Sequence, residues 1–268
     1  MAALFMIPDF PNSLEPRIAG YEFTFVTTGH SSARVYKLEH PEKPDLFLKI
    51  QGSGNLESLK IDARKLEWLH YCRIQVPQMQ VFLEENRFEF LLTSAIPGHD
   101  AASVWDKTEI PKILEILAKN LKNLHSLEIQ HCPFDQRLEL KFSEAYTRVL
   151  ENLVDETDFD EERLGKSAEI VFQELLEKQP PTEDLVFTHG DYCLPNVLID
   201  NLEFAGFIDL GRAGIADRYQ DLALMTRSLE SDMNPQFNGW SSYFLEQYGI
   251  LEPDLAKLKF YRLLDEFF

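Results

Sequence analysis

Residues 187–211 read FTHGDYCLPNVLIDNLEFAGFIDLG, and this stretch decides how the rest of the chain is interpreted. It carries Asp191, Asn196 and Asp209 at intervals of five and thirteen residues, among short apolar runs. Phosphoryl transfer from ATP needs a carboxylate for the acceptor hydroxyl and oxygen ligands for Mg²⁺. The ordered set of residues is typical of that chemistry, with Asp191 facing the acceptor and Asn196 and Asp209 binding the metal.

The same stretch predicts the local structure around these residues. The apolar runs 197–199 and 204–208 are expected to form a hairpin around Asp200-Asn201. A hairpin would bring Asn196 and Asp209 to one ion. Gly190 permits a tight turn, and we expect His189 to pack inside the loop without acting on substrate. Asp191 could remove the acceptor proton early or mainly orient the oxygen, and the sequence leaves both roles open.

The composition limits the class of protein. The chain has 268 residues, 44% of them hydrophobic and 26% charged, as expected for a globular protein with a substantial core. Its 26 Lys and Arg against 45 Asp and Glu give a formal net charge of −19, which disfavours nucleic acid and anionic membranes as partners. Three scattered cysteines predict reduced thiols. With no apolar run long enough for a membrane span and no secretory signal, the cytoplasm is the expected location, and no obligate protein partner is indicated.

The pattern of apolar residues changes near Ile96-Pro97-Gly98. Before this step, short alternating runs predict strands over 21–27, 34–38, 46–50, 80–83 and 88–93, with one helix carrying Leu59, Ala63, Leu66 and Leu69. After it, helical spacing dominates, and helices are expected after Pro111 and over 137–151, 167–177, 217–229 and 254–264. The sequence therefore predicts an α+β chain with a small β-rich lobe, residues 1–96, and a larger mostly helical lobe, residues 97–268.

The expected strand 46–50 places Phe47 and Lys49 on one face. An aromatic ring beside a lysine suits an adenine and its phosphates, although a buried strand with a surface lysine has the same pattern. A carboxylate on the following helix should pair with Lys49; Glu57, Asp62 and Glu67 are candidates. The loop 27–32, with Ser31, could cover the phosphates, but it lacks the common glycine-rich patterns.

At this point the chain resembles a known family. The segment HGDYCLPNVLIDNLEFAGFIDLGRAGIADRYQDLAL is similar to the aminoglycoside 3′-phosphotransferases, antibiotic-resistance kinases with a protein-kinase-like fold. The resemblance extends over CPFDQRL, LVDETDFDEERLG and the C-terminal KLKFYRLLDEFF, and is weakest in the first twenty residues. One departure is Asp62, six residues before Trp68, where the family carries Glu; this places the efficiency of nucleotide positioning in doubt.

The resemblance implies two lobes with ATP and Mg²⁺ in a cleft, and the transfer of phosphate to the 3′-hydroxyl of an aminoglycoside. It implies adenine against Phe47 near Ser94-Ala95-Ile96, phosphates on Lys49, and Asp191 as the catalytic base. It further implies a pocket for the aminoglycoside that comprises Asp158, Asp160, Glu161, Arg212, Arg227, Asp265, Glu266 and Phe268 with its terminal carboxylate.

The acidic residues agree with a polycationic substrate. Seven of the twelve residues 151–162 are acidic, and Asp265-Glu266 add a second group at the C-terminus. Such runs are often only solvated faces, but several converging carboxylates would favour a substrate that carries ammonium groups. Two alternatives remain: a kinase for another small hydroxyl compound, such as a macrolide, a choline-like base or a sugar, and a catalytically silent nucleotide-binding protein.

Overall fold

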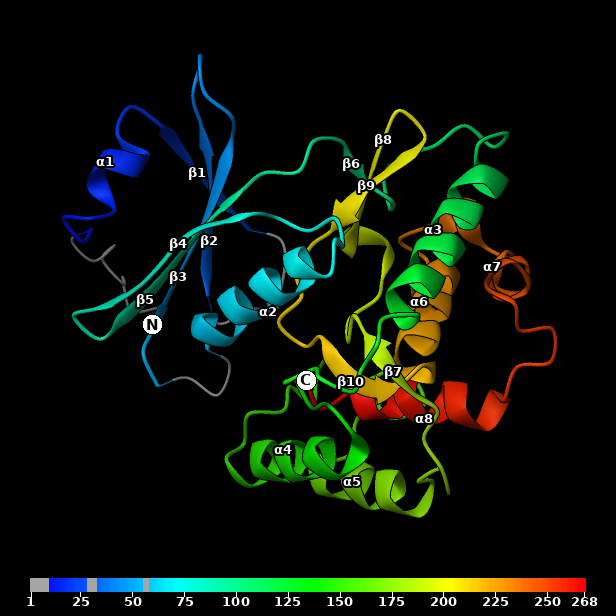
Figure 1. The fold of residues 1–268 in the computed structure, drawn as a ribbon. Coiled ribbons are helices and arrows are strands. Elements are labelled where there is room, and N and C mark those ends of the chain that lie inside the picture. Colours follow the sequence, from blue (N-terminus) through cyan, green and yellow to red (C-terminus); the bar gives the residue numbers. More distant parts are fainter. Residues whose placement is uncertain (1–9, 28–32, 55–57) are drawn as a thin grey trace. The chain divides into compact units, whose positions relative to one another are not determined.

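The computed structural model describes residues 10–27, 33–54 and 58–268. Contacts between Cα atoms divide the chain into two compact units, Met1–Pro97 and Gly98–Phe268 (Figure 1). The division falls one residue after the boundary expected at residue 96. Within the described ranges, no helix combines the length and the apolar character needed to cross a membrane.

The first unit is built on one antiparallel sheet of five strands. In spatial order these are β1 (Glu22–Val26), β2 (Arg34–Glu39), β3 (Leu46–Gly52), β5 (Phe88–Ser94) and β4 (Met79–Glu85). All five coincide with the apolar runs in the sequence. In β3, Leu48 and Ile50 are buried, whereas Phe47 and Lys49 on the other face are half-buried, as the alternation predicts.

Two helices belong to this unit, α1 (Glu15–Ile18) and α2 (Leu59–Tyr71). The predicted apolar stripe of α2 is buried, and the helix packs against β4 and β5. Its first turn is held by Ser58, whose Oγ accepts from the N–H of Lys60, and by the buried carboxylate of Glu89. That carboxylate accepts from Ser58 Oγ at 2.7 Å and from the N–H of Leu59 at 2.8 Å. These contacts hold the first turn of α2, which also carries Asp62, against β5.

The second unit is mostly helical. Its α-helices are α3 (Ile110–His125), α4 (Leu138–Leu150), α5 (Ala168–Glu177), α6 (Tyr219–Glu230), α7 (Ser241–Tyr248) and α8 (Leu255–Asp265). Helix α3 packs against α7, α6 against α7 and α8, and α4 against α5 (Figure 1). Five of these helices were predicted, and α7 was not. The prediction for α6 began at residue 217, whereas the helix begins at Tyr219 because Gly214–Asp217 pair as a strand.

Short strands and turns connect these helices. Strand β7 (Leu185–Thr188) pairs with β10 (Gly214–Asp217), and a second small sheet contains β6 (His99–Asp100), β8 (Val197–Asp200) and β9 (Glu203–Phe207). Two 3₁₀ turns are η1 (Leu194–Asn196) and η2 (Pro235–Phe237). The predicted β8–β9 hairpin is present, but its turn is Asn201-Leu202, with φ of 49° and 60°, one residue later than expected. Two positive φ angles are the signature of the tight hairpin turn that matches strand twist.

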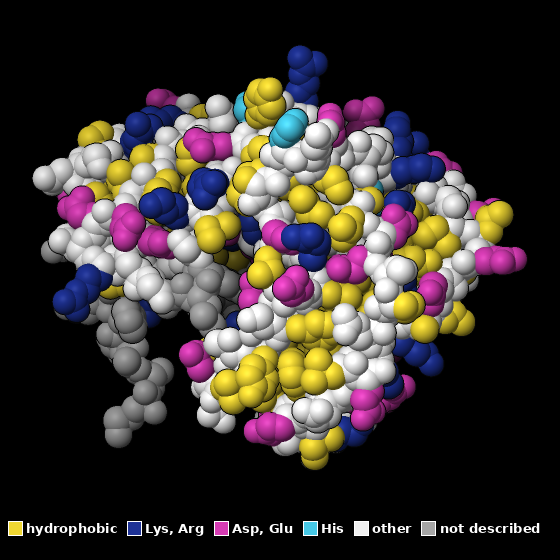
Figure 2. Space-filling model, turned by 60° about the horizontal axis from the view of Figure 1, so that its bottom comes forward, with side chains coloured by type: hydrophobic (Ala, Val, Ile, Leu, Met, Phe, Trp, Pro, Cys, Tyr) yellow, Lys and Arg dark blue, Asp and Glu magenta, His cyan; other side chains and the backbone are white. Residues whose placement is uncertain are grey.

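Helices α4 and α5 leave several large apolar side chains exposed, among them Tyr146, Leu150 and Ile170. Hydrophobic side chains also gather in patches on the face that Figure 2 presents, with Asp and Glu spread around them. The acidic segment of the sequence lies in the connection between these two helices, residues 151–167. We call this connection the acidic loop.

Candidate active site

Residues 189–196, here called the catalytic loop, lead from β7 into η1 and are held by the carboxylate of Asp221. Asp221 lies in the first turn of α6 and is fully buried. Its Oδ2 accepts the backbone N–H of His189 at 2.7 Å, and its Oδ1 accepts that of Gly190 at 2.8 Å. Two charge-assisted bonds to consecutive amides fix the start of the loop relative to α6.

Gly190 is required by both conformation and space. Its φ of +84° is in the left-handed region, where a side chain is strained. A Cβ atom at this position would lie 2.1 Å from the carbonyl oxygen of Arg212. Because the obstacle is backbone, it cannot yield as a flexible side chain would. The segment at Arg212 therefore packs directly on the catalytic loop.

His189 supports the loop from inside, as the sequence predicts. Its side chain is buried, with Nε2 at 3.0 Å from the carbonyl of Ile208 and Nδ1 accepting the N–H of Asp191 at 3.3 Å. These two contacts require hydrogen on Nε2 and none on Nδ1. Burial lowers the pKa of His189 despite the nearby carboxylates of Asp221 and Asp191, which favours this neutral form.

Asp191 is held at both oxygens and remains partly open to solvent. Its Oδ2 accepts from Nδ2 of Asn196 at 2.9 Å, and its Oδ1 lies 3.2 Å from Nη2 of Arg212. Its side chain is 31% exposed. A carboxylate fixed in orientation yet accessible is suited to receive a hydrogen bond from an acceptor hydroxyl.

Asn196 and Asp209 lie at the same end of the β8–β9 hairpin, because the N–H of Ile208 donates to the carbonyl of Asn196 at 3.0 Å. Nδ2 of Asn196 donates to the carbonyl and to Oδ2 of Asp191, so the amide oxygen is the end turned away from Asp191. Asp209 has a φ of 58°, an uncommon conformation outside glycine that clusters at functional sites. One carboxylate and one amide oxygen fit Mg²⁺, which keeps several waters as ligands.

Two arginines and the buried Asp265 extend this network. Arg212 Nη2 donates to Oδ1 of Asp265 at 2.8 Å, and Arg227 pairs with Oδ2 of the same carboxylate. Burial alone would raise the pKa of Asp265, but the two guanidinium groups hold that pKa below its usual value. The chain Asp191–Arg212–Asp265–Arg227 thus links the catalytic loop to the C-terminus.

The acidic loop is tied to the C-terminus and to α5. The N–H of Asp160 donates to Oε2 of Glu266 at 3.2 Å, and Oδ2 of Asp160 pairs with Arg163. The Arg163 side chain is only 5% exposed, and its Nη2 lies 3.0 Å from Oε1 of Glu174. Burial, followed by the charge of Asp160, raises the pKa of Glu266 to about 7. Asp158 and Glu161 are exposed on the same loop.

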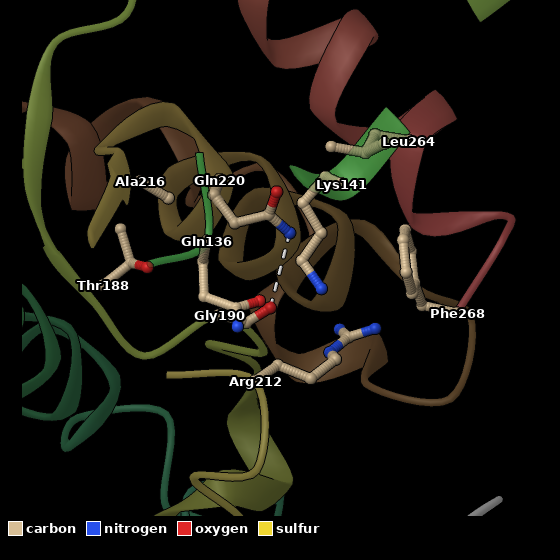
Figure 3. A pocket seen from close by; sticks show the side chains of 9 residues that line it. All are labelled: Gln136, Lys141, Thr188, Gly190, Arg212, Ala216, Gln220, Leu264 and Phe268. Carbon is tan, nitrogen blue, oxygen red and sulfur yellow. Dashed lines mark hydrogen bonds between the residues drawn. The ribbon is translucent and has the colours of Figure 1, made fainter. Parts of the chain in front are cut away.

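The C-terminal Phe268 borders a small cavity beside the catalytic loop. Nζ of Lys141 lies 4.1 Å from the centroid of the Phe268 ring, and the cavity measures about 10 Å³ (Figure 3). Gln220 Nε2 donates to the carbonyl of Gly190 at 3.3 Å across it. The lining residues are Gln136, Lys141, Thr188, Gly190, Arg212, Ala216, Gln220, Leu264 and Phe268. The C-terminus is thus packed close to the backbone of the catalytic loop.

In the first unit, Lys49 Nζ lies 3.9 Å from Oδ2 of Asp62, with both side chains partly exposed. Ser94 is tied to the start of β4, since its Oγ accepts the N–H of Gln78 at 2.9 Å. Ile96 is half-buried in the segment after β5. Ser31 lies outside the described residues.

The comparisons with known proteins identify the family. Residues 22–261 match the model of the phosphotransferase enzyme family. An aminoglycoside 3′-phosphotransferase of Streptomyces fradiae is 40% identical over 265 residues, covering 96% of this chain and 99% of that protein. The chain belongs to the aminoglycoside 3′-phosphotransferase family. The predicted α+β fold, with a β-sheet N-terminal part and a helical C-terminal part, is confirmed.

Two solved structures are similar to this chain. The crystal structure of aminoglycoside-3′-phosphotransferase of type VIII superposes with a TM-score of 0.88 at 39% identity, covering 96% of this chain and 97% of that one. Aminoglycoside phosphotransferase APH(3″)-Id from Streptomyces rimosus, in complex with ADP and streptomycin, gives 0.80 at 26% identity and covers 95% of each chain.

Three residues of this aminoglycoside 3′-phosphotransferase family member lay outside the sequence prediction. Asp221 anchors the catalytic loop, and its only signal was an acid within the apolar face of a helix. His125, which bonds to Asp221, ends the apolar stripe of α3. Arg163 had no signal beyond its position among acids, because its partner Glu174 lies on another element.

Proposed function

We propose that this protein transfers the γ-phosphate of ATP to the 3′-hydroxyl of an aminoglycoside, which yields ADP and the phosphorylated drug. The names of its relatives support the reaction class and the acceptor, and the ADP complex of the Streptomyces rimosus protein supports nucleotide use. The cytoplasm, predicted from the sequence, suits this use of ATP.

The arrangement around Asp191 is the observation that carries the proposal. One oxygen of this carboxylate accepts from Asn196 and the other pairs with Arg212, and Asn196 shares the end of a hairpin with Asp209. In this assignment Asp191 orients the acceptor hydroxyl and receives its proton as the oxygen–phosphorus bond forms. Arg212 holds the Asp191 carboxylate in its orientation.

Asn196 and Asp209 are proposed to hold Mg²⁺, which when bound supplies neutralising charge to the phosphate oxygens. In the first unit, Lys49 would bind the nucleotide phosphates, with Asp62 orienting its ammonium group. Phe47 would pack on the adenine, and Ser94 and Ile96 would border it. The alternation of side chains along β3 gives Phe47 and Lys49 the shared face that these roles need.

The aminoglycoside is proposed to bind the carboxylates of the acidic loop and of the C-terminus. Asp158, Asp160 and Glu161 would bind ammonium groups of the drug together with Glu266, beside Phe268. Arg212 and Arg227 would not contact the drug themselves in this proposal, because both pair with Asp265 and would hold that carboxylate in place. Several partly desolvated ion pairs together could supply on the order of 8 kcal/mol, which corresponds to micromolar affinity.

The test is ADP release by the purified full chain with MgATP, using kanamycin, tobramycin (which lacks the 3′-hydroxyl) or no acceptor. We expect turnover with kanamycin and none above background with tobramycin. Equal turnover with both would contradict the 3′ position while leaving the kinase. Silence with both, while ATP still binds, would favour another acceptor or a non-catalytic protein.

A further inference from the structure

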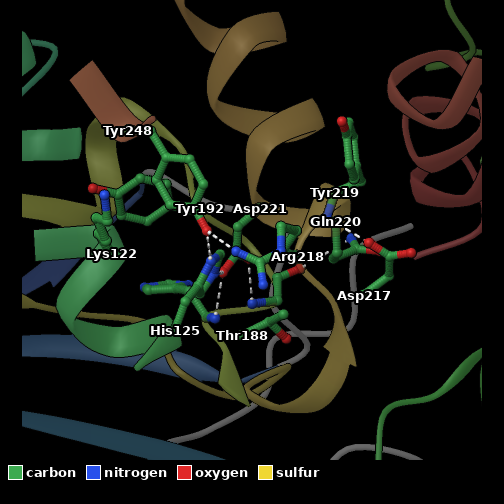
Figure 4. Close-up of polar contacts among 12 residues, drawn as sticks. Lys122, His125, Thr188, Tyr192, Asp217, Arg218, Tyr219, Gln220, Asp221 and Tyr248 are labelled. Atoms are coloured by element: carbon green, nitrogen blue, oxygen red, sulfur yellow. Dashed lines mark hydrogen bonds and ion pairs between the residues drawn. The ribbon is translucent and has the colours of Figure 1, made fainter. Parts of the chain in front are cut away.

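A chain of buried hydrogen bonds leads from Asp221 away from the catalytic loop (Figure 4). Nε2 of His125 lies 2.9 Å from Oδ2 of Asp221, and Nδ1 of His125 lies 2.7 Å from the hydroxyl of Tyr248. Nη1 of Arg218 donates to the same hydroxyl at 3.0 Å. His125 ends α3, Tyr248 ends α7 and Arg218 precedes α6, so three helices meet at this chain of contacts.

The outer end of this chain is fixed by a two-point ion pair. Nε and Nη2 of Arg218 donate to the two carboxylate oxygens of Asp184 at 2.6 and 3.1 Å. The backbone N–H of Arg218 also donates to the carbonyl of Asp184 at 3.0 Å. Asp184 is 55% exposed, whereas the side chains of His125 and Asp221 are almost fully buried. The contacts therefore run from solvent to the interior.

Donor and acceptor chemistry gives the chain one direction. The guanidinium group of Arg218 has only donors, so the Tyr248 oxygen accepts from it and its hydroxyl hydrogen is available to Nδ1 of His125. In a neutral His125 ring the hydrogen is then on Nε2, where it donates to Asp221. The opposite tautomer would place an unprotonated Nε2 against a carboxylate oxygen, with two acceptors facing each other.

We propose that Arg218, Tyr248 and His125 form a positioning relay that sets the hydrogen-bonding state of Asp221 and thereby the geometry of the catalytic loop. Oδ2 of Asp221 receives both the His125 bond and the N–H of His189. If Nε2 loses its hydrogen, repulsion moves this oxygen and with it the anchor of the loop. The expected effect on catalysis depends on the proposed role of Asp191. The prediction about the tautomer of His125 is independent of that role.

The first experiment observes the tautomer directly. Two-dimensional ¹H–¹⁵N spectra of the full chain with ¹⁵N-labelled histidine would be assigned for His125 with the variant His125→Gln. We expect hydrogen on Nε2 in the wild type and in Tyr248→Phe, with the Nε2–H resonance shifted in the variant because the bond to Asp221 loses the support of the Tyr248 hydroxyl. Hydrogen on Nδ1 of His125 in the wild type, or an unchanged Nε2–H chemical shift in Tyr248→Phe, would overturn the relay whether or not the protein turns over a drug.

The second experiment measures kcat and both KM values of Tyr248→Phe. We expect kcat to fall roughly tenfold, as positioning errors remote from the reacting atoms do, with each KM within about threefold of wild type. The control is Tyr243→Phe on the same helix, which removes a hydroxyl that bonds exposed Glu115 at 3.2 Å; it should match the wild type.

A variant at the exposed end of the relay guards against loss of folding. Arg218→Lys removes the guanidinium group that binds both oxygens of Asp184 and donates to Tyr248. We expect kcat to fall less than in Tyr248→Phe, and the unfolding temperature to equal that of the wild type. Wild-type kcat in both Tyr248→Phe and Arg218→Lys, or equal losses in Tyr248→Phe and Tyr243→Phe, would contradict the proposal.

Discussion

In the catalytic loop, backbone amides of His189 and Gly190 bond to a fully buried carboxylate, and Gly190 has no room for a single extra carbon atom. In the acidic loop, Asp158 and Glu161 are exposed, and Arg163 is the buried group that ties the loop to α5. The first region has one conformation that its surroundings enforce. The second is tied by side-chain contacts, of Arg163 with Glu174 and of Glu266 with the Asp160 amide, and has a solvated outer face.

The proposed reaction needs two things, a precisely positioned acceptor oxygen and a bound polycation, and the two loops differ in which of these they suit. Positioning an acceptor oxygen needs a fixed carboxylate, and a misplacement of about 1 Å can cost roughly 10²-fold in rate. Binding a polycation needs charge at adaptable positions, since exposed ion pairs contribute only about 0–1 kcal/mol each. We therefore expect changes in the catalytic loop to alter kcat and changes in the acidic loop to alter the KM of the drug.

The largest effect is expected at Asp191. Asp191→Asn keeps the shape but cannot receive a proton, so kcat should fall by about 10²-fold or more, as measured by ADP release at saturating substrates. Asp200→Asn, at the exposed far end of the β8–β9 hairpin, is the control and should retain wild-type turnover. An Asp191→Asn variant with most of its activity would contradict the mechanism.

Gly190→Ala should be the next most damaging change. The left-handed φ costs about 1–3 kcal/mol in strain, and the new Cβ meets the Arg212 backbone. We expect a lower unfolding temperature together with a fall in kcat, from thermal denaturation and steady-state rates. Gly239→Ala, also at a positive φ but with open space around it, is the control for strain alone. Equal kcat in the two variants would show that the close approach to Arg212 does not position Asp191.

A smaller, pH-dependent effect is expected from Glu266 in the substrate region. With a pKa of about 7, its carboxyl is neutral below that pH and anionic above it. The KM of the aminoglycoside should therefore fall several-fold between pH 6 and 7.5, and Glu266→Gln should remove this change. A pH dependence that persists unchanged in Glu266→Gln would assign it to another group.

The same pKa has a consequence for stability. The ordinary carboxyl pKa of 4.5 describes the unfolded chain, whereas the folded chain keeps the proton to about 7. The folded state binds the proton more tightly, so this group lowers the free energy of unfolding as the pH rises through that interval. Denaturation of wild type and Glu266→Gln at pH 5 and 8 would measure the difference.

The smallest effect is expected at Asp62, within the first unit. The Lys49–Asp62 pair is long at 3.9 Å and partly exposed, so Asp62→Glu should leave the KM of ATP unchanged or lower it by at most about fivefold. A clear rise in that KM would show that Asp62 does not orient Lys49.

Much of the fold could be predicted because it depends on local pattern. The alternation in β3 and the stripe of Leu59, Ala63, Leu66 and Leu69 in α2 were sufficient to predict those elements. Helix α7 was missed, since its eight residues are too few for periodicity to stand out. Asp217 was assigned to a helix. It lies instead in β10, where it pairs with Leu185 of β7, more than thirty residues away in the sequence.

In the candidate site, too, residues placed by local sequence could be predicted, whereas residues placed by distant contacts could not. Asp191, Asn196 and Asp209 were chosen from their spacing, and one hairpin brings the two proposed metal ligands, Asn196 and Asp209, together. Asp221 and Arg163 were not predicted, because the amides that bond Asp221 and the Glu174 partner of Arg163 lie on elements that meet only in the folded chain. The roles of Arg212 and Arg227 also depend on such contacts: both are used to hold Asp265.

The most direct test of the comparison is a steady-state measurement on Arg163→Met, with kcat and the KM values of kanamycin and ATP determined together. The variant removes the buried ion pairs between the acidic loop and α5 and leaves the catalytic loop untouched. Arg137→Met, at an exposed arginine paired with Asp135, is the control. We predict a KM for kanamycin raised on the order of tenfold, about 1.4 kcal/mol, with kcat and the KM of ATP near wild type. A fall in kcat with an unchanged KM for kanamycin would contradict the division of labour between the two loops.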